Sequence, residues 1–392
     1  MNYILFDGPF RNALLPFTYT RPVADIRFGI LTIREKWERY LGATTTTITE
    51  DYLVSKFPMV ELEENTLINA SYTPNENLVE MIQNLKPKQV IYDGEIVVAF
   101  RAAETQSEID FDAFEPLVCP ELTLSVKNTW SIFQLNGAAI EADFQLITKN
   151  RTSQPIPEQV VAFNAAQIFI EEGATLLPLC VLNATNGPIY IGKNAEIMEG
   201  SMVRGPFALC ANSVLKMGAK IYGPTTIGPH SKVGGEVNNA VFFGYSNKAH
   251  DGFLGNSVIG EWCNLGADTN TSNLKNNYAE VRLWNYESEN FAKTGLQFCG
   301  LLMGDHSKCG INTMFNTGTV VGVSANVFGS GFPRNFIPSF SWGGHSGLST
   351  YLTKKAFEVA QVVMKRRGVE FTDIDAAILT EVFEQTKGYR TA

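Results

Sequence analysis

The stretch 191–237, IGKNAEIMEGSMVRGPFALCANSVLKMGAKIYGPTTIGPHSKVGGEV, repeats every six residues. An aliphatic residue recurs at that interval, and a small or β-branched residue follows most of them by four positions. The aliphatic positions are Ile191, Ile197, Val203, Leu209, Leu215, Ile221, Ile227 and Val233. A period of six fits neither a helix, whose period is 3.6, nor a hairpin strand, whose period is 2. It is typical of a parallel β-helix, in which each coil stacks on the next.

The same period returns later in the chain, at Ile259 and Leu265 and again from Met303 to Val327. It is interrupted over 236–252 and over 271–302, and such interruptions usually mark loops that project from one face of a solenoid. We therefore predict a β-helix over 158–335, with a projecting loop at each interruption.

Two further segments flank the predicted β-helix. Residues 1–152 are mixed, with strands predicted over 2–6, 44–49, 66–69, 89–92 and 96–100 and helices over 30–40 and 78–85, so an α/β layer domain is expected. Residues 336–392 form a C-terminal extension, in which helical spacing over 351–367 and 372–386 predicts a helix pair that closes an open sheet edge.

Composition excludes several classes of partner. The chain carries a formal charge of −9 and has no basic run, which argues against nucleic acid, so an anionic ligand must be held by a few local basic groups. The six cysteines are scattered without CxxC spacing, which fits a reducing compartment. No signal peptide and no membrane-spanning apolar run are visible, so a cytoplasmic protein without membrane contact is expected.

The four histidines can be weighed one by one. His230 lies in a regular repeat and is expected to be an outward turn residue, His306 lies in the late repeats, and His345 lies in a Gly/Ser-rich stretch where a structural role and a ligand contact both remain open. His250 differs, because it lies in the first interrupted region. A lone histidine is more often structural than catalytic, and these four do not offer the spacing of a three-histidine zinc site.

The run 248–275, KAHDGFLGNSVIGEWCNLGADTNTSNLK, resembles the acetyltransferase segment of the bifunctional UDP-N-acetylglucosamine pyrophosphorylase/glucosamine-1-phosphate N-acetyltransferase family. The histidine, the Leu-Gly, the Ile-Gly and the Asn-Leu-Gly-Ala of that segment match, and the spacing from His250 to Ala267 and Asn273 is preserved without gaps. Two positions depart from the family pattern: Phe253 replaces a tyrosine and Asp268 replaces a glycine. The resemblance implies a left-handed parallel β-helix.

The same resemblance implies roles for individual residues. His250 would be the catalytic base, Asn273 would contact the sugar phosphate, and Ala267 would lie near acetyl-CoA. Further candidates in this half are Glu236 and Lys248 for substrate binding and Gly266 for acetyl-CoA binding. Asp251, next to His250, could orient the imidazole.

The chemistry of such a site is plausible in its own right. An amino sugar arrives largely as an ammonium ion, which cannot attack a thioester until it loses a proton. A neutral imidazole can accept that proton at cytoplasmic pH, and backbone N–H groups of the coil can stabilise the tetrahedral oxyanion.

The N-terminal segment is similar to sugar-nucleotide transferases, but it is compact. The stretch 15–29 is similar to the region after the phosphate loop of that superfamily, and 66–69 to a strand end near the nucleotide, whereas the usual glycine-rich entry loop is replaced by 6–12. Four residues of this segment are candidates for nucleotide binding: Arg11, Arg21, Arg27 and Asn69. The arginines suit bidentate phosphate contacts, but an equally good reading makes them surface or helix-capping charges.

Nucleotidyl transfer of this type would also need Mg²⁺ held by carboxylates. Asp7, Asp25 and Asp93 are the candidates, and the sequence does not choose among them.

Together these observations predict acetyl-CoA-dependent N-acetylation of an amino-sugar phosphate such as glucosamine 1-phosphate, coupled to nucleotidyl transfer from UTP that gives UDP-N-acetylglucosamine. The resemblance implies a homotrimer. Two alternatives stay open: a sugar-1-phosphate nucleotidyltransferase with a scaffold β-helix, and a non-catalytic nucleotide-sugar-binding protein.

Overall fold

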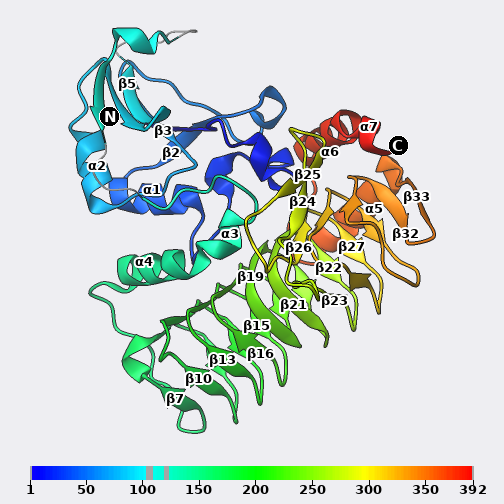
Figure 1. Cartoon of the computed structure of the whole chain (residues 1–392). Coiled ribbons are helices and arrows are strands. Elements are labelled where there is room, and N and C mark those ends of the chain that lie inside the picture. The colour runs from blue at the N-terminus through cyan, green and yellow to red at the C-terminus, as the bar shows by residue number, and fades with distance from the viewer. Residues whose placement is uncertain (1, 103–108, 119–122, 391–392) are drawn as a thin grey trace.

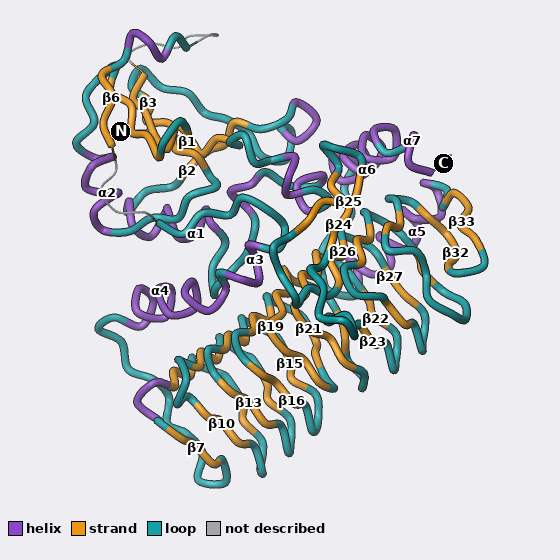
Figure 2. The backbone as a smooth tube through the Cα atoms, in the orientation of Figure 1, coloured by secondary structure: helices purple, strands orange, loops and turns teal. Residues whose placement is uncertain are grey.

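The computed structural model describes residues 2–102, 109–118 and 123–390. Figure 1 shows an N-terminal α/β domain beside a long parallel β-solenoid, with helices from the C-terminus packed against the solenoid. Figure 2 shows the same path with the solenoid strands stacked coil on coil. The predicted fold class, an α/β domain followed by a parallel β-helix with terminal helices, is confirmed. No helix in the described part of the chain is long and apolar enough to cross a membrane.

The N-terminal domain is built on a six-stranded mixed sheet of order β2-β1-β3-β5-β4-β6, in which β1 runs parallel to both neighbours. Its elements follow the predicted order closely. They are β1 (Asn2–Phe6), α1 (Ile33–Leu41), β2 (Thr45–Ile48), β3 (Asn65–Asn69), α2 (Glu76–Gln83), β4 (Gln89–Asp93), β5 (Ile96–Ala102) and β6 (Glu115–Val118).

Local sequence explains where the first helix begins and ends. Thr32 and Glu35 form a capping box that satisfies two amide donors at the start of α1, and Gly42 adopts φ 64° at its end. The sequence prediction missed two helices, α3 (Ser131–Gln134) and α4 (Asn136–Thr148). Both lie between the sheet domain and the solenoid, where α4 packs its apolar side on the solenoid wall.

The solenoid has three parallel faces per coil. The first face contains β7 (Val161–Phe163), β10 (Val181–Asn183), β13 (Met202–Arg204) and β16 (Lys220–Tyr222). The second contains β8 (Ile168–Ile170), β11 (Ile189–Ile191), β14 (Phe207–Leu209), β17 (Thr225–Ile227), β26 (Leu301–Met303), β29 (Thr319–Val321) and β31 (Phe336–Ile337). The long strands β19 (Glu236–Gly244) and β21 (Phe253–Glu261) run through both of these faces.

The third face forms its own sheet, and two short strands continue the first face in the later coils. The third-face strands are β9 (Thr175–Leu176), β12 (Glu196–Ile197), β15 (Val214–Leu215), β18 (Lys232–Val233), β20 (Asn247–Lys248), β22 (Asn264–Leu265), β27 (Lys308–Cys309), β30 (Asn326–Val327), β32 (Ser341–Gly344) and β33 (Gly347–Thr350). The continuing pair is β23 (Asn270–Thr271) and β28 (Met314–Phe315).

The six-residue period corresponds to one face of the prism. Its aliphatic side chains fill the interior and are almost fully buried. At the corners the chain turns through left-handed residues, among them Asn194 (φ 54°), Asn212 (φ 58°) and Asn312 (φ 55°), and asparagine tolerates this conformation better than most side chains.

The expectation of a projecting loop over 236–252 is wrong. The coil simply shortens there, because Gly234 and Gly235 make a tight corner and β19 follows at once. Val237, Phe242 and Lys248 then occupy the interior positions of that coil, so the six-residue count fails although the fold continues.

The second interruption does leave the coil, as predicted, but it does not stand free. It carries the hairpin of β24 (Arg282–Asn285) and β25 (Asn290–Lys293). The side chains of Val281 and Leu283 join the core of the N-terminal domain, and the Tyr286 ring meets Tyr19 edge-on. The inserted segment therefore ties the solenoid to the domain beside it.

The C-terminal helices are α5 (Thr353–Lys365), α6 (Asp373–Gln385) and α7 (Lys387–Arg390). They do not close the last open edge, which is taken instead by β33 pairing antiparallel to β32. α5 lies along the third face, where Arg367 just beyond it donates to Asn247, and α6 reaches the N-terminal domain through the ion pair between Lys56 and Asp375.

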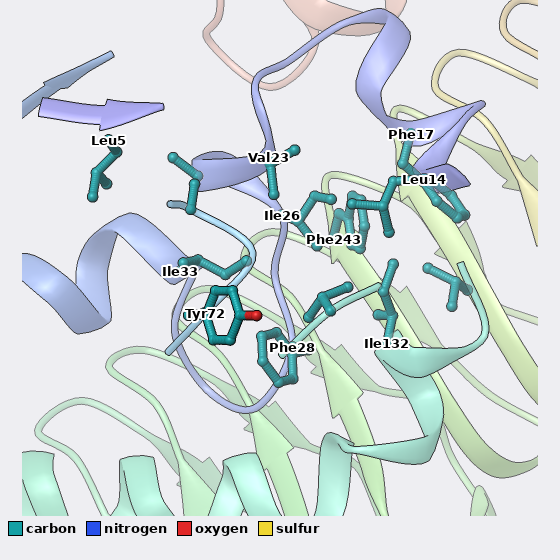
Figure 3. Close-up of a cluster of buried hydrophobic side chains, with 14 of the residues drawn as sticks. Leu5, Leu14, Phe17, Val23, Ile26, Phe28, Ile33, Tyr72, Ile132 and Phe243 are labelled. Atoms are coloured by element: carbon teal, nitrogen blue, oxygen red, sulfur yellow. The ribbon is translucent and has the colours of Figure 1, made fainter. Parts of the chain in front are cut away.

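One continuous hydrophobic core joins the two domains. Figure 3 shows Phe243 of the solenoid among Leu14, Phe17 and Ile26 of the N-terminal domain. Phe17 and Phe243 lie with ring centroids 5.1 Å apart. Because apolar side chains from both domains are buried in the same cluster, separating the domains would expose much of that core to water.

Candidate functional site

His250 lies at the corner between the third and first faces, just after β20. Its side chain is exposed, and Ala267 occupies the equivalent corner of the next coil, where the amide of Asp268 donates to the carbonyl of Asp251. The predicted base and the predicted acetyl-CoA contact are therefore neighbours along the solenoid axis. Asp251 is exposed, and no described contact joins its carboxylate to the imidazole.

Lys248 lies beneath this corner, inside the prism. It takes the interior position that Val233 holds on the previous coil, and only 1% of its surface is exposed. Its Nζ donates to the carbonyl oxygens of Gly234 (3.0 Å) and His250 (2.9 Å), and burial lowers the pKa of the ammonium group to about 8. The structure thus gives this predicted substrate-binding residue a different contact: it holds the backbone of His250.

Two hollows meet at His250. The first, which we call the corner groove, has a volume of about 810 Å³ and runs along the corner past Met217, Gly235 and Ala267. The second, which we call the α5 groove, has a volume of about 740 Å³ and lies between the third face and α5. Ala267 borders both grooves, and Gly266 borders the second, so these two predicted cofactor contacts share a site with the histidine.

The predicted sugar-phosphate contacts lie on the adjacent first face. Glu236 begins β19, pairs in register with Phe253 and is turned outward because Val237 points inward. Asn273 lies at the far corner of that face, where its amide donates to Asn256 Oδ1 (2.8 Å). Both residues lie outside the two grooves that His250 lines, so within one chain they are not gathered around the imidazole.

The departures from the family pattern have local structural consequences. Asp268 adopts φ 55°, a conformation that glycine adopts freely and that aspartate tolerates better than most residues, so the corner keeps its shape. The Phe253 ring lies beside Gly255 near the Asn273 amide. A phenyl ring there provides an apolar wall but no hydroxyl donor.

All four nucleotide-binding candidates make contacts within the protein. Arg11 donates to Asp7 Oδ2 (3.1 Å) and to the carbonyl of Thr18 (2.7 Å), and Arg27 donates to the carbonyls of Phe243 and Ile30. The Asn69 amide donates to the Val97 carbonyl (3.0 Å) and lies against Gly8, so close that a side chain at Gly8 would collide with it.

The fourth candidate, Arg21, contacts side chains of the solenoid. It is buried, donates to Asp305 Oδ2 and lies 3.4 Å from Glu261 Oε1, and both carboxylates belong to the solenoid. Its Nε has no partner among the described residues and lies beside a cavity of about 250 Å³ at the junction of the domains.

Each of the three candidate Mg²⁺ carboxylates has hydrogen-bond partners within the protein. Asp7 accepts from Thr49 and Arg11, Asp25 forms a two-pronged pair with Arg34, and Asp93 accepts from Tyr72. Across the described ranges, no three His, Cys, Asp or Glu side chains come close enough to hold a metal ion. The Mg²⁺ site therefore stays a prediction.

The remaining histidines have structural surroundings. His230 and His306 belong to a stack of rings at the corner before the third face, with Tyr245 and Trp262 between them and centroid distances of 4.7, 4.2 and 6.3 Å along the stack. Burial lowers the pKa of His306 to about 3, so its ring is neutral. The His345 Nδ1 lies 2.9 Å from the Phe332 carbonyl, and the ring lines a separate cavity at the C-terminal end of the solenoid.

Sequence reasoning missed four basic residues in the α5 groove: Lys232, Lys308, Arg366 and Arg367. Arg366 and Arg367 are adjacent, but Lys232 and Lys308 lie far from them and from each other along the chain, so the sequence does not group the four. One signal was available: two of them directly precede an interior position of the repeat, which places their side chains outward on the same face.

Comparison with known proteins finds one family model and several partial relatives. Residues 3–152 match the family model described as sugar nucleotidyl transferase. The chain is 28% identical over 144 residues to a bifunctional sugar-1-phosphate nucleotidylyltransferase/acetyltransferase of Sulfurisphaera tokodaii, covering 36% of this chain and 35% of that protein. It is 33% identical over 87 residues to the bifunctional protein GlmU of Methanocaldococcus jannaschii, covering 22% of this chain and 21% of that protein.

Among solved structures, a UDP-N-acetylglucosamine acyltransferase of Francisella novicida aligns over 59% of this chain and 85% of its own, with 13% identity and a TM-score of 0.30. The chain spans about a third of the length of the Sulfurisphaera relative. The Sulfurisphaera relative is by its name a transferase, and residues 3–152, which match the sugar nucleotidyl transferase model, precede a parallel β-solenoid.

Proposed function

We propose that the solenoid half is an acetyl-CoA-dependent N-acetyltransferase that acts on an amino-sugar phosphate such as glucosamine 1-phosphate. The observation that carries this proposal is the position of His250: an exposed imidazole between two grooves, with Ala267 on the next coil and its own backbone carbonyl bound by a buried lysine. The name of the Sulfurisphaera relative, which includes an acetyltransferase, agrees with such an activity.

In this reaction His250 acts as general base. It takes a proton from the amino group, whose nitrogen then attacks the thioester carbon, and the carbon–sulfur bond breaks as the tetrahedral intermediate collapses. The proton on the imidazole is available for the leaving thiolate. The amide of Ala267 makes no hydrogen bond to another described residue, so it is free to donate to the developing oxyanion.

The experiment is to measure thiol release from acetyl-CoA with glucosamine 1-phosphate as acceptor. His250→Ala should lower the rate roughly 10²–10⁴-fold, the usual contribution of a positioned general base. His345→Ala is the matched control, because His345 is also exposed but lines a different cavity. Equal rates for wild type and His250→Ala would refute the assignment, and an inactive wild type would favour the scaffold alternative.

A second function is favoured by the family match over residues 3–152: transfer of a uridylyl group from UTP to a sugar 1-phosphate, giving UDP-N-acetylglucosamine. We assign no carboxylate of this domain to a metal-dependent step. The test is pyrophosphate release from UTP with N-acetylglucosamine 1-phosphate. Binding of UTP or of the UDP-sugar without turnover would favour the non-catalytic alternative.

A homotrimer is part of the proposal. Large apolar side chains stay exposed on the corner column that includes His250: Leu179 (75% exposed), Met217 (65%) and Ile311 (70%). Exposed apolar side chains aligned in this way are typical of a surface that another chain covers. Sedimentation of wild type beside Met217→Asp tests this, since a charge in the contact should dissociate the assembly, and a monomeric wild type would exclude it.

A further inference from the structure

The α5 groove is strongly cationic in a chain whose net charge is −9. Four basic side chains line it, and the described residues that line it include no carboxylate. None of the four forms an ion pair with any carboxylate in the described ranges. A cluster of uncompensated cations along one groove attracts a ligand with several negative charges.

The basic groups span several coils of the third face. Lys232, Asn247, Asn264 and Lys308 pair successively in register, each one strand further along. Strands lie about 4.8 Å apart, so the Cα atoms of the two lysines are separated by about 14 Å. Arg366 and Arg367, at the end of α5, lie on the opposite wall.

Parts of this cation cluster are held in place before any ligand arrives. Arg367 donates to Asn247 Oδ1 (3.0 Å), and Lys308 Nζ donates to the carbonyl of His306 (2.7 Å). Burial lowers the pKa of Lys308 to about 8, so an anion beside it would compensate a charge that the fold leaves without a counter-ion.

We propose that the α5 groove holds the phosphates of the acyl-CoA, with the thioester directed along the third face toward His250. Arg366 and Arg367 follow α5 in the same chain, so the C-terminal extension would complete the cosubstrate site in cis. This inference rests on the proposed acetyltransferase function and adds a location and binding residues to it.

A phosphorylated acyl carrier suits the groove better than a sugar monophosphate. One phosphate can engage one or two of the cations, whereas CoA carries a diphosphate and a 3′-phosphate that can meet cations on both walls. The volume of about 740 Å³ lies in the range of pockets that bind extended organic ligands. The histidine and Ala267 lie at one edge of the groove, where the thioester must be placed.

The test is calorimetric binding of CoA, which requires no turnover. The double variant Arg366→Gln/Arg367→Gln should weaken CoA binding roughly 100-fold, because hydrogen bonds to charged groups are among the stronger polar contacts. Lys365→Gln is the matched control: it removes one exposed charge from the same helix outside the groove. Lys232→Gln provides a second test from the opposite wall, should the double variant fail to fold.

Binding of related ligands shows whether the groove holds the phosphates of CoA or the phosphate of the sugar. Dephospho-CoA should bind more weakly than CoA to the wild type, and pantetheine, which has no phosphate, should bind weakly and equally to wild type and double variant. If glucosamine 1-phosphate is the ligand that loses affinity in the double variant while CoA does not, the groove is an acceptor site and the inference is wrong.

The two proposals fail in different ways. If CoA binds wild type and the double variant with the same affinity, or does not bind wild type at all, the inference is overturned. Suppose instead that CoA binds wild type, that the double variant binds it more weakly, and that no thiol is released with any amino-sugar phosphate. The groove is then a CoA site, and the proposed reaction is wrong.

Discussion

The ion pair between Arg21 and Asp305 gives the sharpest prediction about how the two domains hold together. Arg21 is 6% exposed and Asp305 is 3% exposed. Asp305 also accepts from the Thr20 hydroxyl (2.7 Å) and from the amide of Glu261 (2.8 Å). The substitution Arg21→Met removes the cation and leaves the buried carboxylate with those two hydrogen bonds alone.

The magnitude follows from the burial of the pair. Removing one partner of a buried ion pair costs about 3–5 kcal/mol, because the other charge stays in a poorly solvated place. We expect Arg21→Met to lose about 3–5 kcal/mol at pH 7.

Urea unfolding of four proteins measures this prediction: wild type, Arg21→Met, Asp305→Asn and the double variant. The double variant should regain about 2 kcal/mol or more relative to the sum of the two single losses, because no unpaired charge remains. Lys355→Met is the control, since its partner Glu358 is exposed and such pairs contribute at most about 1 kcal/mol.

Two results would refute the reasoning: a loss below about 1 kcal/mol for Arg21→Met, or single losses that add without coupling. The measurement also bears on function. A drop in any activity of an Arg21 variant can be assigned to nucleotide binding only after its stability has been measured.

Two further predictions concern buried basic groups. Lys248→Met should leave the free energy of unfolding unchanged or higher at pH 7. In the wild type that free energy should rise between about pH 8 and pH 10.5, because the unfolded chain there holds a proton that the buried lysine has lost, and the substitution should abolish this rise. Urea unfolding at a series of pH values measures both effects, and an unchanged rise in the variant would contradict the buried position. The pKa of His306 is about 3 in the folded protein, against an ordinary value of 6.5. Between these two pH values only the unfolded chain binds the proton, so the free energy of unfolding should fall as the pH drops from about 6.5 toward 3. His306→Phe should make this decline shallower, and an equally steep decline in the variant would count against the neutral buried ring.

The solenoid could be predicted from the sequence because every coil repeats the same local requirement. An inward aliphatic residue every sixth position and a turn residue between faces are readable without knowing any long-range contact. The prediction failed over 236–252 because it counted residues. A pair of glycines shortened the corner, and a lysine took an interior position that the repeat reserves for an apolar side chain.

The nucleotide-binding candidates of the N-terminal domain show that residue type alone does not identify the contacts of a side chain. Arg21 and Arg27 were predicted as phosphate ligands because of their type and their place in the chain. Arg27 instead binds the Phe243 carbonyl, and Arg21 pairs with solenoid carboxylates more than 200 positions away in sequence. Their nucleotide-binding role stays a prediction, to be tested beside the structural role that the contacts reveal.

By itself the sequence determined the parallel β-solenoid and the order of elements in the α/β domain, because each depends on spacing along the chain. Only the tertiary structure decided that the two domains share one core, that Lys248 lies beneath the histidine, and that Lys232, Lys308, Arg366 and Arg367 line one groove. The physical reason is that burial and charge compensation depend on contacts between segments far apart in sequence, and those contacts exist only once the chain has folded.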